Sequence, residues 1–165
     1  AALTGHLVFS TLHTNDAPGA ITRLVDMGVK PFLVASSIQA IMAQRLVRIL
    51  CPKCREPYEP PDLELQLLEL RREDLKGKPF HKPAGCEACE MSGYRGRKGI
   101  YELMEMTRVV RELAFRKAPT HEIRKAAIAG GMKTLRQDAI RKLAKGMTSA
   151  REVLEITVGA AADAA

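Results

Sequence analysis

The four cysteines of the chain constrain its fold more than any other feature, because they fall into two C-x-x-C pairs. Cys51 and Cys54 form the first pair, Cys86 and Cys89 form the second, and residues 55–85 lie between them. Two C-x-x-C turns that face each other make a tetrahedral four-sulfur site, which suits Zn²⁺. The intervening segment is too short to build a core of its own, so a bound metal would stabilise its fold.

Other interpretations of the cysteines fit less well. Two disulfides need an oxidising compartment, and no secretory signal is recognisable. A redox C-x-x-C usually occurs once, and the spacing is not that of the common ferredoxin clusters. His81 could replace one ligand, but four cysteines already complete the shell, so we interpret it as a solvated loop histidine. The sequence therefore predicts a closed structural zinc site with no position for a substrate.

Composition and charge bound the class of protein. The 165 residues suffice for one domain or two small ones, and an apolar content of 46% is typical of globular proteins. No apolar run approaches the roughly 18 residues of a membrane span. No N-terminal stretch reads as a targeting peptide, so we expect a cytoplasmic protein. The net charge of +7 comes from residues 95–145, which carry fourteen basic and five acidic side chains. This excess fits either an anionic partner or the solvated faces of amphipathic helices.

Hydrophobic periodicity predicts helices and strands along most of the chain. Residues 7–11 are apolar and β-branched, which suits a buried parallel strand, and such a strand needs neighbours from a larger sheet. The later elements, in chain order, are helices 17–27 and 31–44, strand 45–50, helix 62–75, strand 100–106, and helices 107–116, 120–129, 134–145 and 149–158. On helix 62–75 we expect Leu63, Leu67 and Leu70 to share the buried face.

Three local patterns refine this outline. Residues 76–79 (KGKP) should end helix 62–75. Residues 93–99 are basic and rich in glycine, but their spacing matches neither G-x-G-x-x-G nor the Walker pattern, so a plain loop is favoured over a phosphate cradle. Ser149 and Glu152 have the spacing of a capping box.

Two histidines flank the predicted first strand. His6 precedes it, and a polar turn follows it that contains Thr11, His13, Thr14 and Asn15. Open α/β sheets bind ligands just beyond the carboxyl ends of their strands, so this turn is a candidate ligand site. Isolated loop histidines are also often structural or solvated, and spacing alone leaves both interpretations open.

Four ordered motifs span most of the chain. They are residues 4–15 (TGHLVFSTLHTN), residues 43–46 (AQRL) with the first cysteine pair soon after, residues 96–102 (GRKGIYE) and residues 148–154 (TSAREVL). Together they resemble the secretion-superfamily ATPases, which drive type II secretion and type IV pilus assembly; the first motif is similar to the histidine box of that family. The cysteine pairs resemble the zinc element of the extension subfamily, which favours a pilus extension or type II secretion motor.

The resemblance implies an α/β fold: the C-terminal portion of a RecA-like P-loop NTPase core, with a zinc-binding insertion and a C-terminal helical domain. The expected segments are 1–50 for the end of the core, 51–95 for the zinc subdomain, 96–158 for a strand and the helical domain, and 159–165 for a disordered tail. No G-x-x-x-x-G-K-[ST] motif occurs in the sequence. We therefore expect the chain alone to be inactive, because phosphoryl transfer depends on positioning and charge stabilisation.

The resemblance also implies cofactors and partners. Zn²⁺ would be structural, whereas ATP and Mg²⁺ would bind the full-length parent. The partners would be the parent's own N-terminal domains, neighbouring subunits of a homohexamer and an inner-membrane platform protein, with no specific nucleic acid. The expected location is cytoplasmic, peripheral to the inner membrane.

Carried over residue by residue, the resemblance places His6 and His13 near the γ-phosphate side of the nucleotide. There they would sense nucleotide state, supported by Thr11, Thr14 and Asn15. Arg45 and Arg48 could contact phosphate or a neighbouring subunit, or form an ordinary exposed strand face. The zinc ligands would be Cys51, Cys54, Cys86 and Cys89, and we expect no catalytic residue after Cys89. Rival hypotheses are a zinc-ribbon nucleic-acid-binding module and a scaffold without nucleotide contact.

Overall fold

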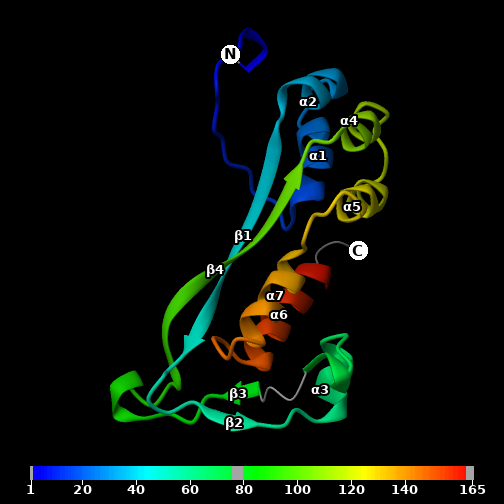
Figure 1. Ribbon diagram of the computed structural model, residues 1–165. Coiled ribbons are helices and arrows are strands. Elements are labelled where there is room, and N and C mark those ends of the chain that lie inside the picture. Colours follow the sequence, from blue (N-terminus) through cyan, green and yellow to red (C-terminus); the bar gives the residue numbers. More distant parts are fainter. Residues whose placement is uncertain (1, 76–79, 163–165) are drawn as a thin grey trace. The chain divides into compact units, whose positions relative to one another are not determined.

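The computed structural model describes residues 2–75 and 80–162, with side chains up to residue 156. The chain forms two compact units, each made of two separate segments. The first comprises Ala1–Gln44 and Tyr101–Thr134, and the second comprises Arg45–Ile100 and Leu135–Ala165. These limits differ from the consecutive segments expected from the sequence, because two long paired strands, β1 (Ala40–Leu50) and β4 (Tyr94–Glu105), each contribute residues to both units (Figure 1).

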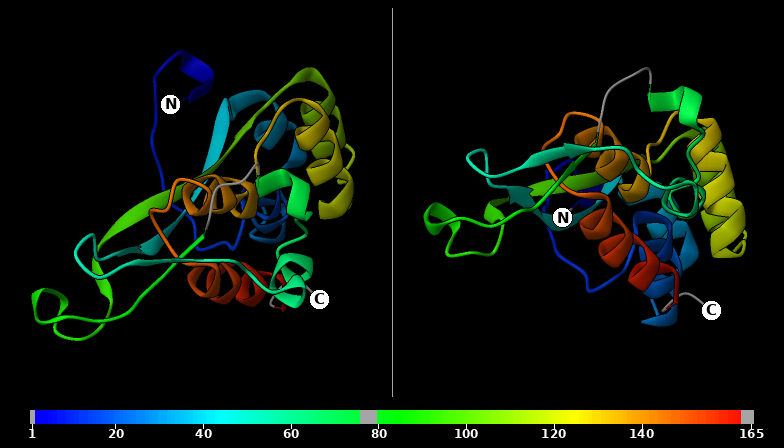
Figure 2. Two further views of the ribbon diagram at one scale, coloured as in Figure 1. Left: turned by 60° about the horizontal axis from the view of Figure 1, so that its bottom comes forward. Right: turned by 90° about the horizontal axis from the view of Figure 1, so that it is seen from below.

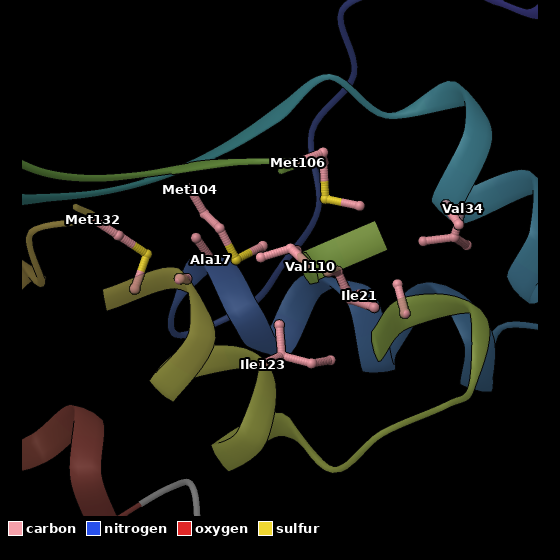
Figure 3. Close-up of a cluster of buried hydrophobic side chains, with 11 residues drawn as sticks. Ala17, Ile21, Val34, Met104, Met106, Val110, Ile123 and Met132 are labelled. Carbon is pink, nitrogen blue, oxygen red and sulfur yellow. The ribbon is translucent and has the colours of Figure 1, made fainter. Parts of the chain in front are cut away.

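The first unit packs four helices against its parts of β1 and β4. The helices are α1 (Ala17–Asp26), α2 (Pro31–Ser37), α4 (Arg108–Phe115) and α5 (Thr120–Ala129), preceded by a 3-10 turn at Ala2–Thr4. Figure 3 shows apolar side chains gathered in one cluster, whose labelled members include Met104 from β4, Ile21 from α1 and Ile123 from α5. This core holds the start of α1 against β4 and α5.

The strand expected at residues 7–11 is wrong. No helix or strand is formed from residue 5 to residue 16. The side chains of Leu7, Val8 and Phe9 are 79%, 54% and 88% exposed. A buried parallel strand needs hydrogen-bonded neighbours, and the two sheets of the described residues, β1–β4 and β2–β3, do not include this segment.

Helix α2 is shorter than the periodicity predicts. It ends at Ser37, and β1 already begins at Ala40, so residues 40–44 are strand rather than helix. The hydroxyls of Ser36 and Ser37 donate to the carbonyls of Phe32 and Leu33 within the last turn. Such side-chain bonds compete with continuation of the helix, and the β-branched residues that follow favour a strand.

The second unit combines a small hairpin-like sheet with two helices. Strands β2 (Glu56–Tyr58) and β3 (Phe80–Lys82) pair antiparallel, with Pro57 opposite His81. Helices α6 (Leu135–Leu143) and α7 (Ala150–Ala162) lie side by side, as both views in Figure 2 show. The shorter elements of this unit are α3 (Asp62–Leu67) and the 3-10 turns Arg72–Leu75 and Glu87–Cys89.

The buried face expected between the cysteine pairs is wrong. Leu65 and Leu68 are 4% and 0% exposed, whereas Leu63 and Leu67 are 68% and 51% exposed. Helix α3 ends after six residues, and Glu69 follows with a left-handed φ of 56°, so no continuous face extends to residue 75. The expected stop at residues 76–79 lies outside the described residues.

Two further segments, residues 93–99 and the C-terminal tail, differ from expectation. The predicted loop at 93–99 is a strand from Tyr94 onward, where Gly96 adopts a φ of +82° that suits glycine. Helix α7 continues to Ala162, which includes part of the tail expected to be disordered, and residues 163–165 lie outside the described residues. Among the described helices, none is both long and apolar enough to cross a membrane.

Candidate metal centre and histidine segment

The four cysteines come together in the second unit. Their sulfur atoms all lie within 4.8 Å of one another. The Sγ–Sγ distances are 3.9 Å for Cys51 and Cys86, 3.8 Å for Cys54 and Cys89, and 3.7 Å for Cys86 and Cys89. A tetrahedron with metal–sulfur bonds of ~2.3 Å has edges of ~3.8 Å. All four thiols are free, so the cluster has the size and chemistry of a metal site rather than a pair of disulfides.

Backbone hydrogen bonds shape both cysteine turns. In the first turn, Cys54 N and Arg55 N donate to the carbonyl of Cys51, directly after β1 ends. In the second turn, Met91 N donates to the carbonyl of Cys86. The two turns are joined by a 2.9 Å bond from Cys51 N to Gly93 O. The four sulfurs are therefore placed by the backbone of both segments.

Gly93 is required at this junction. Its φ is +74°, and a Cβ there would lie 2.3 Å from Cβ of Pro83. Its N–H donates to Cys89 Sγ at 3.2 Å, as does the N–H of Cys86. Although burial opposes ionisation, these backbone bonds lower the pKa of the Cys89 thiol to about 6. Amide donors to sulfur are suited to a thiolate ligand.

His81 is not one of the four clustered ligands. It lies on β3 and is half-buried, so its interpretation as a solvated loop residue is wrong. Among the residues that the structure describes, none bonds its buried Nδ1 atom, and Gly146 lies against the ring.

Arg48 is engaged by α7. Its backbone N–H and its Nε both donate to the carboxylate of Glu152, at 2.8 and 2.7 Å. The guanidinium lies 4.3 Å from the ring centre of Tyr94. The hydrogen bond to Glu152 raises the pKa of Arg48 above its ordinary value. A phosphate would have to compete with Glu152 for this group, so the role suggested for Arg48 stays a prediction, as does that of the exposed Arg45.

The candidate nucleotide-sensing residues lie in one segment, residues 6–15, which we call the histidine segment. His6 and His13 are exposed, whereas Thr14 and Asn15 are half-buried. The hydroxyl of Thr4 lies 3.0 Å from Nδ1 of His6. Both histidines belong to irregular backbone rather than to the ends of a strand, and their proposed role remains a prediction.

The sequence analysis did not identify two residues that contact the chain just after this segment. Glu102 and Arg124 contact Ala17 and Asp16, at the start of α1. A signal for Glu102 existed: it occupies an inward position of β4 between Ile100 and Met104, where a charged side chain needs a partner.

Comparison with known proteins identifies the family. Residues 1–155 match the model of the type II/IV secretion system protein family. The chain belongs to this family. Relatives include the type II secretion system protein E of Pseudomonas aeruginosa, 48% identical over 95% of this chain, and the type IV pilus assembly ATPase PilB of Myxococcus xanthus, 46% identical over 93%. PilB of Thermus thermophilus is 42% identical over 96%.

The chain is much shorter than these relatives. The chain spans 31%, 27% and 18% of their respective lengths. The similar identities to secretion and pilus proteins do not separate the two branches.

Proposed function

We propose that this chain is the C-terminal region of an ATPase motor that powers type II protein secretion or type IV pilus assembly. The observation that carries the proposal is the family match over residues 1–155, with relatives named as secretion proteins and pilus assembly ATPases. The nucleotide would be ATP with Mg²⁺, bound mainly by parts of the full-length protein outside this chain. The chain alone would not hydrolyse ATP, because it carries no Walker motif.

In the full-length motor, the histidine segment would sense the nucleotide. Neutral imidazole donates one hydrogen bond and imidazolium donates two with a charge, so His6 and His13 suit a terminal phosphate. The exposure of both side chains supports this proposal, since neither is buried in the core of the first unit. Thr11, Thr14 and Asn15 would supply further polar contacts.

Zn²⁺ would be the metal of the cysteine cluster, and its role would be structural. Four sulfurs at tetrahedral spacing support it, because they favour zinc and leave no open coordination position. The ion would link the end of β1 to the start of β4 through the two cysteine turns.

The assembly would be a homohexamer at the cytoplasmic face of the inner membrane. There it would push on a membrane platform protein when nucleotide state changes. The basic segment 95–145 carries an excess charge that suits an acidic or anionic partner. A RecA-like core would be completed by other parts of the full-length protein, including neighbours for the exposed apolar residues 7–9.

The test is ATP hydrolysis by the full-length protein, wild type and His13→Ala. The proposal expects Mg²⁺-dependent turnover in the wild type and a loss of turnover in the variant, with unchanged folding by circular dichroism. Absence of turnover in the wild type, or equal turnover in both proteins, would contradict it. Steeply salt-dependent DNA binding with sub-micromolar affinity would instead favour the nucleic-acid module.

A further inference from the structure

Glu102, on β4, accepts a hydrogen bond from the first residue of α1. Its Oε1 accepts a hydrogen bond of 2.9 Å from the backbone N–H of Ala17, a residue 85 positions away in sequence. Glu102 is only 2% exposed. The first N–H groups of a helix have no partner within the helix, so this bond satisfies a donor that would otherwise be buried and unpaired.

Arg124 holds the residue just before α1. Asp16 is the N-cap of that helix, and its Oδ1 accepts from the N–H of Gly19 at 2.7 Å. Its Oδ2 accepts from the guanidinium of Arg124 on α5. The side chains of Asp16 and Arg124 are 15% and 36% exposed, so the pair is partly shielded from water. Two carboxylates therefore complement the positive end of the helix dipole.

These contacts fix one end of the histidine segment. His13, Thr14 and Asn15 directly precede Asp16, and no helix or strand holds the chain from residue 5 to residue 16. The contacts of Asp16 and Ala17 therefore anchor the chain three residues after His13. A displacement of about 1 Å in a positioned group can cost about 100-fold in rate.

We propose that Glu102 and Arg124 are positioning residues for the histidine segment, and this rests on the proposed function. Neither side chain touches the nucleotide. Glu102 acts through the N–H of Ala17, and Arg124 acts through the carboxylate of Asp16. Together they present His13 at a fixed place relative to α5, so the nucleotide state sensed by His13 is coupled to that helix.

The test uses the full-length ATPase with four single variants. Arg124→Met removes the ion pair while keeping much of the side-chain volume, and Arg124→Lys keeps the charge. Glu102→Leu removes the acceptor, whereas Glu102→Gln keeps an acceptor for Ala17. We expect Arg124→Met and Glu102→Leu to lower kcat by about tenfold or more, with the lysine and glutamine variants restoring most of it. Arg23→Met, at an exposed position of α1 outside the basic segment, is the control and should leave kcat unchanged.

A double variant separates positioning from general stability. If Arg124 acts through His13, then Arg124→Met should lower kcat far less in a His13→Ala background than in the wild type. Thermal unfolding identifies variants that fail to fold. If Glu102→Leu does not fold, the test rests on Arg124→Met, because the half-exposed Arg124 can be replaced with less damage to the core. Active wild type with an unchanged kcat in Arg124→Met would overturn the inference, and so would full additivity with His13→Ala. Inactive wild type would instead overturn the proposed function.

Discussion

Arg48 on β1 and Glu152 on α7 are joined three times. The backbone N–H and the Nε of Arg48 donate to the two carboxylate oxygens of Glu152, and a terminal guanidinium nitrogen lies 2.6 Å from the same carboxylate. The Glu152 side chain is 5% exposed, whereas that of Arg48 is 48% exposed. The buried carboxylate thus depends on a cation that reaches it from the surface.

Removing this cation should destabilise the second unit. Among the described donors to the Glu152 carboxylate at this contact, Arg48→Met leaves the backbone N–H. Loss of charged hydrogen bonds costs about 1.5–3 kcal/mol. We expect the low end of this range because the Arg48 side chain is half in solvent. Arg151→Met, which breaks an exposed pair with Glu155, is the control and should cost less than about 0.5 kcal/mol. Urea unfolding measures the free energy of unfolding of both variants. Equal losses in Arg48→Met and Arg151→Met would contradict a stabilising role for the buried Glu152 contact.

Losing one cysteine should remove the metal and loosen the segment between the pairs. We expect about one zinc per wild-type chain in a metal assay, by the four-ligand rule. Cys51→Ser should lose the metal, and hydrogen exchange should rise first in residues 51–89 while helices α4 and α5 stay protected. Chelation of the wild type should give the same exchange pattern. Zinc retained at full stoichiometry in Cys51→Ser would exclude the four-cysteine site.

Gly93 and Gly96 provide a matched pair of substitutions near that site. Gly93→Ala would place a Cβ 2.3 Å from Pro83 and strain a φ of +74°, whereas the position of a Cβ on Gly96 is open. Gly96→Ala should therefore cost only the backbone strain, about 1 kcal/mol. Gly93→Ala should cost more and weaken zinc binding, because Gly93 N–H and C=O contact both cysteine turns. Competition with a chelator measures the difference.

The core of the first unit predicts a further contrast. Met104 is fully buried in the cluster shown in Figure 3, whereas Met42 is 59% exposed. Met104→Ala should cost about 2–5 kcal/mol through lost burial and the cavity left behind. Met42→Ala should stay within about 0.5 kcal/mol. Thermal unfolding of the two variants would show whether the cluster is the main core of that unit.

Local signals predicted part of this structure. Helix α1 was predicted to within one residue because Asp16 and Pro18 mark its start and Gly28 follows its end. The cysteine cluster followed from spacing alone. Ser149 Oγ accepts from the N–H of Glu152 at 3.2 Å, which is one half of the predicted capping box, whereas the Glu152 carboxylate accepts from Arg48.

Long-range pairing explains what the sequence did not reveal. The capping-box spacing predicts a contact within α7, whereas the Glu152 carboxylate accepts a hydrogen bond from Arg48, 104 positions away. The strand at residues 7–11 was predicted from composition, but a strand exists only where another strand supplies hydrogen bonds. The prediction of helix 31–44 is wrong beyond Ser37. The apolar residues at 38, 41 and 42 have helical spacing, but residues 40–44 belong to β1, which pairs with β4.

If this chain is part of a nucleotide-driven motor, as we propose, its histidine segment should sense ATP. The most direct measurement is steady-state ATP hydrolysis by the full-length protein, comparing wild type with His13→Ala at matched zinc content. We expect Mg²⁺-dependent turnover that falls at least about tenfold in the variant. A fall of this size is typical of a lost coupling between sites, and it is smaller than the loss of about 10²–10³ for a polar contact made only in the transition state. Equal turnover in the two proteins would contradict it.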